Sequence, residues 1–128
     1  MLDGARMDMN VTETADGITH VVLDGRFDIA GAQEVDSRFG PLAERSKALI
    51  VDLTKVSFIA SLGVRTLMMS AKTLIRRGAD MAVCGANDNV EKVLRSTGFN
   101  EVAWIYPDFA SAESALASRA ADFASRKG

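Results

Sequence analysis

The most constraining feature of the sequence is a short, almost unbroken apolar run, ALIVDL, at residues 48–53. A run of this kind, without polar alternation, is typical of a central strand that is covered on both faces. From Ser61 onward, the spacing of apolar residues predicts an amphipathic helix that ends at Gly78. The apolar stripe of that helix is formed by Val64, Leu67, Met68, Ala71 and Ile75. A buried strand followed by an amphipathic helix indicates an α/β fold.

Further segments on both sides repeat this mixture of strands and helices. Strands are predicted at residues 7–14, 18–23, 81–84 and 102–106, and the turn at Asp16-Gly17 joins the first two as a hairpin. Helical spacing is found for Ile29, Ala32, Val35, Phe39 and Leu42, for Val90, Val93 and Leu94, and for Ala115, Leu116 and Phe123. The predicted order is therefore β-β-α-β-α-β-α-β-α.

Residues that begin, end or interrupt helices refine this prediction. Asn87 and Ser111 are predicted to cap the third and fourth helices, and Gly98 is predicted to close the third. Gly40-Pro41 is predicted to kink or split the first helix, because proline lacks a backbone donor and restricts the residue before it.

The whole chain, residues 1–128, is predicted to form a single domain, because its length suffices for one core and no linker or repeat divides it. We expect a mixed sheet of about five strands with four helices and an N-terminal β-hairpin, and frayed ends at about residues 1–6 and 124–128. The residues expected to be buried around the sheet are Ile50, Val51, Leu53, Leu67, Ala71 and Val83.

Charge and cysteine content exclude several functions. The chain has 15 Lys and Arg residues against 17 Asp and Glu residues, and this balance argues against nonspecific nucleic-acid binding. The single cysteine, Cys84, and single histidine, His20, cannot assemble the usual Cys/His zinc site. No apolar stretch approaches the ~20 residues of a membrane span, and no secretory signal opens the sequence. A cytoplasmic protein without membrane insertion, cofactor or metal is predicted.

Catalytic motifs are also missing, so a noncatalytic protein is predicted. Neither a P-loop nor a Gly-rich dinucleotide turn is present. His20 is interpreted as a structural strand residue and Cys84 as a buried thiol. Asp52 stands where a receiver domain accepts a phosphoryl group, but the acidic pair and lysine of such a site are missing. Asp52 is therefore expected to organise the following loop by accepting backbone hydrogen bonds.

The loop before the long helix is the most informative stretch. Phe58 and Ile59 are expected to form an exposed approach to Ser61, and Gly63 is expected to let another backbone come close. The simplest interpretation of Ser61 is an N-cap, worth about 1 kcal/mol.

Two segments also carry a recognisable pattern. Residues 51–67 contain, in register, Asp52, Leu53, Thr54, Val56, Phe58, Ile59, Ser61 and Gly63. The upstream segment LDGRFDIAGA supplies Gly25, Phe27, Asp28 and Ala32. On these residues, and over nearly the whole chain, the sequence resembles the STAS domain, in particular bacterial anti-sigma factor antagonists of the partner-switching type.

The resemblance implies a phosphorylation switch at Ser61. A partner that is both an anti-sigma factor and a GHKL-type serine kinase would phosphorylate Ser61, and a PP2C-type phosphatase would reverse the reaction. The unphosphorylated form would hold the kinase and release a sigma factor. The aspartate usual before this serine is replaced here by Ala60, and the second hydroxyl residue is replaced by Leu62.

The partner-binding surface implied by the resemblance lies around Ser61. It comprises Asp28, Phe58, Ile59, Ala60, Leu62, Gly63, Val64 and Arg65, with Thr66 as a further polar contact. Asp28 either caps the next helix or contacts the partner. Two other functions stay open: a constitutive STAS scaffold, such as the STAS subunit of a lipid-transporting ABC complex, without phosphorylation, and an enzyme of unrecognised chemistry.

Overall fold

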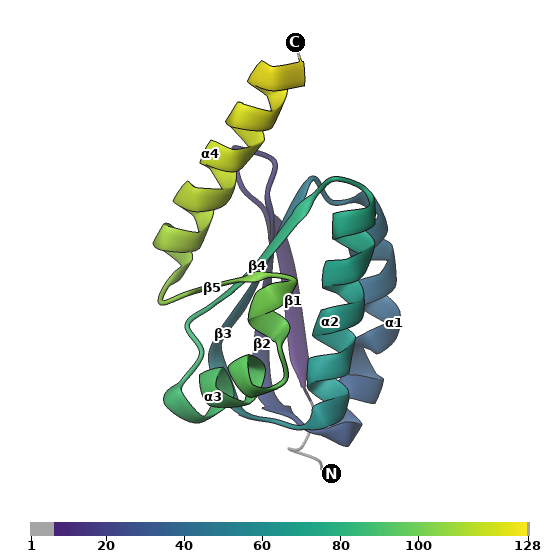
Figure 1. Ribbon diagram of the computed structural model, residues 1–128. Coiled ribbons are helices and arrows are strands. Elements are labelled where there is room, and N and C mark those ends of the chain that lie inside the picture. The colour runs from purple at the N-terminus through teal and green to yellow at the C-terminus, as the bar shows by residue number, and fades with distance from the viewer. Residues whose placement is uncertain (1–6, 128) are drawn as a thin grey trace.

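Five strands and four helices form a mixed α/β sandwich in this computed structural model, which describes the backbone of residues 7–127 and the side chains of residues 7–119 (Figure 1). The elements in order are β1 (Asp8–Glu13), β2 (Thr19–Phe27), α1 (Ile29–Arg45), β3 (Ala48–Ile59), α2 (Ser61–Arg76), β4 (Asp80–Cys84), α3 (Asp88–Ser96), the 3₁₀ turn η1 (Phe99–Glu101), β5 (Trp104–Tyr106) and α4 (Phe109–Lys127). The predicted fold class and the predicted order of elements are confirmed, with η1 as an addition.

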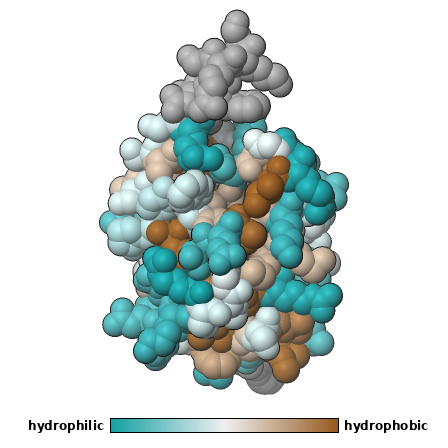
Figure 2. Space-filling view, viewed as in Figure 1, coloured by the Kyte–Doolittle hydropathy of each residue, from teal (hydrophilic) through white to brown (hydrophobic). Residues whose placement is uncertain are grey.

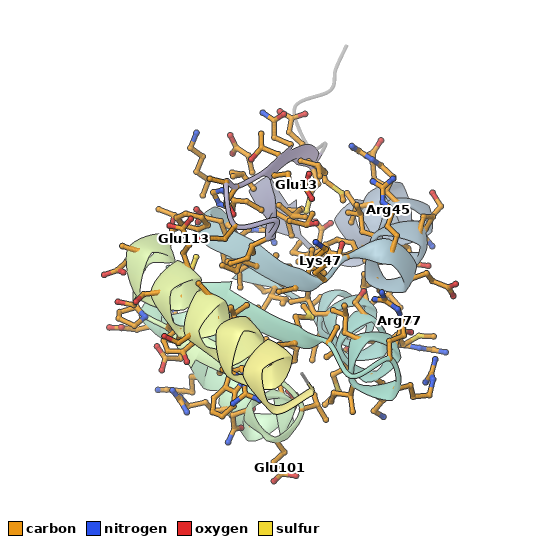
Figure 3. All side chains as sticks on the ribbon, turned by 90° about the horizontal axis from the view of Figure 1, so that it is seen from above. Glu13, Arg45, Lys47, Arg77, Glu101 and Glu113 are labelled. Atoms are coloured by element: carbon orange, nitrogen blue, oxygen red, sulfur yellow. The ribbon has the colours of Figure 1, made fainter. Side chains whose placement is uncertain are left out.

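The sheet has the strand order β1-β2-β3-β4-β5. β1 pairs with β2 antiparallel as the predicted hairpin, and all later neighbours are parallel. The carboxyl ends of β2, β3 and β4 therefore meet at one edge, where α1, α2 and α3 begin. Helices α1 and α2 cover one face of the sheet, and α4 lies on the other (Figures 1 and 3).

Two hydrophobic clusters fill the sandwich. The larger lies between the sheet and α1, α2 and α3, and the smaller lies beneath α4. The six residues expected to be buried, Ile50, Val51, Leu53, Leu67, Ala71 and Val83, all have no exposed surface. This prediction is confirmed.

Two residues of the predicted apolar helix patterns lie on the surface. Ile29 is 61% exposed because it is the first residue of α1, before the buried positions that start at Gly31. Ile75 is 51% exposed, because Leu74, seven residues after Leu67, occupies the buried position of that turn.

Helix α1 is continuous from Ile29 to Arg45 and contains Pro41, so the predicted split at Gly40-Pro41 is wrong. Gly40 has no Cβ to collide with the proline ring, which lets it keep the helical conformation. Gly40 and Pro41 are also exposed, so the carbonyl that loses its donor lies on the solvent side of the helix.

The observed ends of α3 agree with those predicted from the sequence, whereas the observed cap of α4 differs from the predicted one. The Asn87 side chain accepts a 2.8 Å hydrogen bond from Val90 N, and Gly98 follows α3 in the left-handed region at φ 83°. The cap of α4 is Asp108, which accepts from Ser111 N at 2.8 Å, so Ser111 is the donor rather than the cap.

The ends of the chain also differ in part from prediction. Strand β5 has three residues, fewer than the predicted 102–106. The backbone of α4 is helical to Lys127, past the expected start of fraying, whereas residues 1–6 and the side chain of Phe123 lie outside the described part. Within residues 7–127, none of the helices has the length and apolar character needed to cross a membrane.

Hydrogen bonds connect helices α1 and α2 along their length. Thr66 Oγ1 donates to Asp36 Oδ1 at 3.1 Å near the middle. Arg77, at the end of α2, donates to the carbonyls of Ala43 and Ser46 at 2.8 Å each, and Figure 3 shows this side chain between the two helices. These bonds satisfy carbonyls that the end of α1 leaves without an intrahelical donor.

Close backbone approach joins the beginnings of the same helices. Ala60 N donates to the carbonyl of Phe27 at 2.9 Å, which links the residue before α2 to the last residue of β2. Gly63 faces this carbonyl, and a Cβ there would lie 2.8 Å from the Phe27 oxygen and 3.0 Å from its ring. The expectation that Gly63 lets another backbone come close is confirmed.

We therefore expect Gly63→Ala to destabilise the fold by about 1–3 kcal/mol, although alanine is the better helix former, because the new methyl group has no space. Met69→Ala, at an exposed position of the same helix, should change stability by less than about 0.5 kcal/mol. Urea unfolding measures both. A Gly63→Ala variant as stable as the wild type would show that the Phe27 carbonyl does not limit the packing of α2.

Candidate docking surface at the start of two helices

Ser61 is the first residue of α2, and its side chain is exposed. The N-cap position is held by Ala60, whose extended backbone precedes the helix and which offers no side-chain hydrogen bond. The interpretation of Ser61 as an N-cap is therefore wrong, because β3 continues to Ile59 and only Ala60 separates strand from helix. The expectation that Ser61 lies near the surface at a helix N-terminus is confirmed.

Strand β3 is longer than predicted, and two irregularities shape its end. Its register with β2 shifts between Val22 and Asp24 and again between Gly25 and Arg26. At the second shift Ser57 has no partner, as in a β-bulge, and Gly25 adopts φ 129°. Beyond this point Phe58 is 40% exposed, whereas Ile59 is buried.

Asp28 caps α1, which was one of its two expected roles. Its Oδ1 accepts from Gly31 N at 2.9 Å, and its Oδ2 lies 3.5 Å from Arg26 Nε. The hydrogen bond from Gly31, together with the nearby Arg26 guanidinium, holds the pKa of this carboxyl below its ordinary value. A negative charge is thus fixed at the start of α1, where the helix dipole favours it.

Arg26 is a member of this surface that the sequence did not identify. Its guanidinium lies 4.5 Å from the centre of the Phe58 ring, in a cation–π contact. Arg26 pairs with Phe58 in the sheet register, so one arginine contacts both Phe58 and Asp28. Arg26 could have been identified only from the pairing of β2 with the segment around Phe58, and that segment was expected to be a loop.

The structure separates the expected contact residues into exposed and buried ones. Ile59, Gly63, Val64 and Thr66 are buried and belong to the packing beneath the surface. Ala60 and Leu62 are half-buried, and Arg65 is exposed. We define the Ser61 surface by its accessible side chains, which are Arg26, Asp28, Ile29, Phe58, Ser61, Leu62, Arg65 and Met69.

A groove of about 470 Å³ lies between α1 and α2 on this side of the molecule. Leu62, Met69 and Ala32 give it apolar walls, and Asp36 and Arg65 lie among the polar side chains that line it. Figure 2 shows hydrophobic side chains gathered at the lower right, over the first turns of α1 and α2. The arrangement offers an apolar surface with charged neighbours, which suits protein docking.

Asp52 accepts hydrogen bonds as expected, but within β3 rather than in a loop. Its Oδ1 accepts from Thr54 N at 3.0 Å and from Thr54 Oγ1 at 2.6 Å. His20 Nε2 lies 3.2 Å from the other oxygen, and the His20 ring stacks on Phe109 with centroids 3.9 Å apart. The sequence did not predict this pair, because 32 residues separate its members.

Cys84 is fully buried, in agreement with the sequence interpretation. Burial, with smaller effects from Asp52 and Asp108, raises the pKa of its thiol to about 12. The thiol is therefore protonated at neutral pH and does not act as a nucleophile in this arrangement.

Comparisons with known proteins agree with this architecture. A family model described as the STAS domain matches residues 10–112. A Bordetella bronchiseptica protein, BtrV, assigned as an anti-sigma factor antagonist, is 25% identical over 104 residues, which make up 80% of this chain and 87% of BtrV.

Solved structures also resemble this chain. The crystal structure of an anti-sigma factor antagonist from Mycobacterium paratuberculosis matches with a TM-score of 0.78 at 22% identity, covering 86% of this chain and 93% of that one. The phosphorylated form of the Bacillus cell fate determinant SpoIIAA matches with a TM-score of 0.68 at 13% identity, covering 85% of this chain and 99% of that one. These two structures share the fold of this chain.

The contacts of Asp52 predict an acid-sensitive component of stability. Burial raises the pKa of Asp52, but the hydrogen bonds from Thr54 and His20 outweigh it and hold the pKa below the ordinary 3.8. Because the folded pKa is depressed, this stabilisation is present above the ordinary pKa and is lost as the pH falls through the folded value. Asp52→Asn should be less stable at pH 6 but should lose less stability than the wild type below pH ~4. Urea midpoints of the wild type and of Asp52→Asn, measured from pH 6 to pH 2, test this prediction. If the two midpoints fall in parallel with pH, Asp52 does not contribute to the acid sensitivity of the fold.

Proposed function

Because this chain belongs to the STAS domain family, we propose that it acts as an anti-sigma factor antagonist, a noncatalytic module switched by phosphorylation of Ser61. The observation that carries the proposal is the position of Ser61, which is exposed and is the first residue of α2. A hydroxyl in this place is accessible to a kinase, and the helix does not use it as a cap.

In the proposed cycle, the unphosphorylated protein binds an anti-sigma factor that is also a GHKL-type serine kinase, and a sigma factor is released. The kinase phosphorylates Ser61, the complex separates, and a PP2C-type phosphatase restores the binding form. The Ser61 surface is the proposed contact, with Phe58, Leu62 and Met69 as apolar contacts and Arg26 and Arg65 as charged ones. The assignment of the relative BtrV as an anti-sigma factor antagonist supports this role.

Phosphorylation at Ser61 fits the fold but opposes docking. A phosphoryl group adds about −1.5 to −2 charges, and a helix N-terminus favours an anion, so the fold should hardly change. In a docked complex the same group must lose water or face partner groups placed for a hydroxyl. Each ~1.4 kcal/mol of this penalty weakens association tenfold.

Ala60 distinguishes this chain from the usual pattern of an aspartate before the serine. Ala60 leaves the N-cap of α2 without a side-chain hydrogen bond, and the first turn of α2 also carries no acidic side chain. Recognition by the kinase would then depend on the other members of the Ser61 surface, in particular on Arg26, Asp28 and Arg65.

Substitutions at Ser61 test the switch. Ser61→Asp should keep the wild-type melting temperature and lose at least tenfold in affinity for the kinase, because it places a negative charge at the contact. Ser61→Ala should keep both stability and binding, because Ser61 does not cap α2, and it should resist phosphorylation. The kinase is first isolated from native cells through its binding to this protein. Calorimetry then measures the affinity of each variant for the kinase, and intact-mass analysis after incubation with ATP measures phosphorylation.

Ser118→Asp is the matched control, because it adds the same charge at an exposed position of α4. It should bind like the wild type. If ATP and the kinase leave the wild-type mass unchanged, or if Ser61→Asp binds as tightly as the wild type, the constitutive scaffold becomes the better proposal.

Two substitutions at Asp28 separate capping from partner contact. Asp28→Asn keeps an oxygen for Gly31 N but loses the charge that holds Arg26, so stability should change little and affinity should fall. Asp28→Ala should lose about 1 kcal/mol of stability and more than that in binding free energy. Thermal unfolding and calorimetry with the same kinase give both numbers. Wild-type affinity in the two variants would assign Asp28 a purely local role.

A further inference from the structure

The described side chains of the C-terminal helix, α4, include few that are buried. Figure 1 shows α4 apart from the other three helices, on the opposite face of the sheet. Among its described side chains, those of residues 109–119, only Ala112 and Leu116 are buried, and Phe109 and Ala117 are partly buried and pack on them. These residues, together with the sheet side chains beneath them, form the smaller of the two hydrophobic clusters.

The larger core does not depend on α4. None of the described residues of α4 belongs to the hydrophobic cluster beneath α1, α2 and α3. The sheet residues that α4 covers form the separate smaller cluster, and they are Ile18, Ala48, Ile50, Ala82 and Cys84. The loss of α4 from the sheet would therefore leave the main core complete.

Further attachments lie near the two ends of the described part of α4. Phe109 stacks on His20 at one end. At the other end, Arg119 binds both carboxylate oxygens of Asp80, at 2.9 and 3.2 Å, and its guanidinium lies 4.9 Å from the centre of the Trp104 ring. Arg119 and Asp80 are 47% and 30% exposed, and ion pairs this accessible to water contribute little to stability.

Chain connectivity also permits separation. Helix α4 is joined to β5 only through Pro107 and Asp108 on its N-terminal side. Movement of the helix breaks no ladder hydrogen bond of the sheet, because β5 itself stays paired with β4.

We propose that α4 is a separately docked lid, which leaves the sheet as a unit while the five strands and the other three helices remain folded. This opening exposes the apolar sheet face around Ile50 and gives solvent access to Cys84. The proposal is independent of Ser61 and of the function assigned to the opposite side of the molecule. It places the weakest cooperative unit of the fold at α4.

Cys84 reports directly on the opening. It is the one cysteine of the chain, it has no exposed surface, and burial raises its pKa to about 12. In the closed form the thiol is therefore protected from alkylation both sterically and by its protonation. In the open form both protections are removed, so the labelling rate measures the open population.

The experiment measures alkylation of Cys84 by iodoacetamide in native buffer, followed by intact mass, for the full chain and two matched variants. Leu116→Ala weakens only the attachment of α4 and should accelerate labelling at least tenfold. Leu74→Ala removes a leucine of equal burial from the core that both forms retain. It should lower the urea midpoint but change the labelling rate less than twofold.

Equal acceleration of labelling in Leu74→Ala and Leu116→Ala would overturn the proposal, because Cys84 would then become accessible only through global unfolding. Phe109→Ala, which removes the ring that stacks on His20, provides a second variant in case Leu116→Ala fails to fold. It should accelerate labelling severalfold with an unchanged circular dichroism spectrum, and a wild-type labelling rate in this variant would equally contradict a separately docked helix.

Discussion

The hydrogen bond from Ala60 N to the Phe27 carbonyl is the contact on which the rest of the candidate site depends. It brings the ends of β2 and β3 together and so sets the beginnings of α1 and α2 side by side. The approach is close enough that Gly63 has no space for a side chain. Asp28 and Ser61, 33 positions apart in the sequence, therefore occupy one surface because two strands end in register.

Local patterns in the sequence were sufficient for most of the fold. The buried run at residues 48–53 and the helical spacing that follows it correctly predicted a strand and then a helix. This was possible because apolar residues recur at different intervals in buried strands and in amphipathic helices. Asn87 and Gly98 marked the limits of α3 for reasons that act within a few residues. Capping by Asp28 was one of its two expected roles for the same reason, since an N-cap needs only the first turn of its helix.

What the sequence could not predict depends on residues that are distant in the chain. The extension of β3 to Ile59 requires β2 as a partner, so Phe58 was expected in a loop and Ser61 was interpreted as a cap. The contact between Arg26 and Phe58 and the pairing of His20 with Asp52 arise only after the strands are aligned. Neither contact produces a periodic pattern or a characteristic residue spacing that could be recognised in the sequence.

The bonds between α1 and α2 have a consequence for recognition. The two helices are fixed to one another at their beginnings through Phe27 and Ala60, near the middle through Thr66 and Asp36, and at their ends through Arg77. A partner that binds across them meets backbone that is already ordered, so association requires little further loss of conformational entropy. Such a surface is preorganised for rigid-body recognition, and differences in affinity among partners then arise from the side chains that it presents and from their hydration.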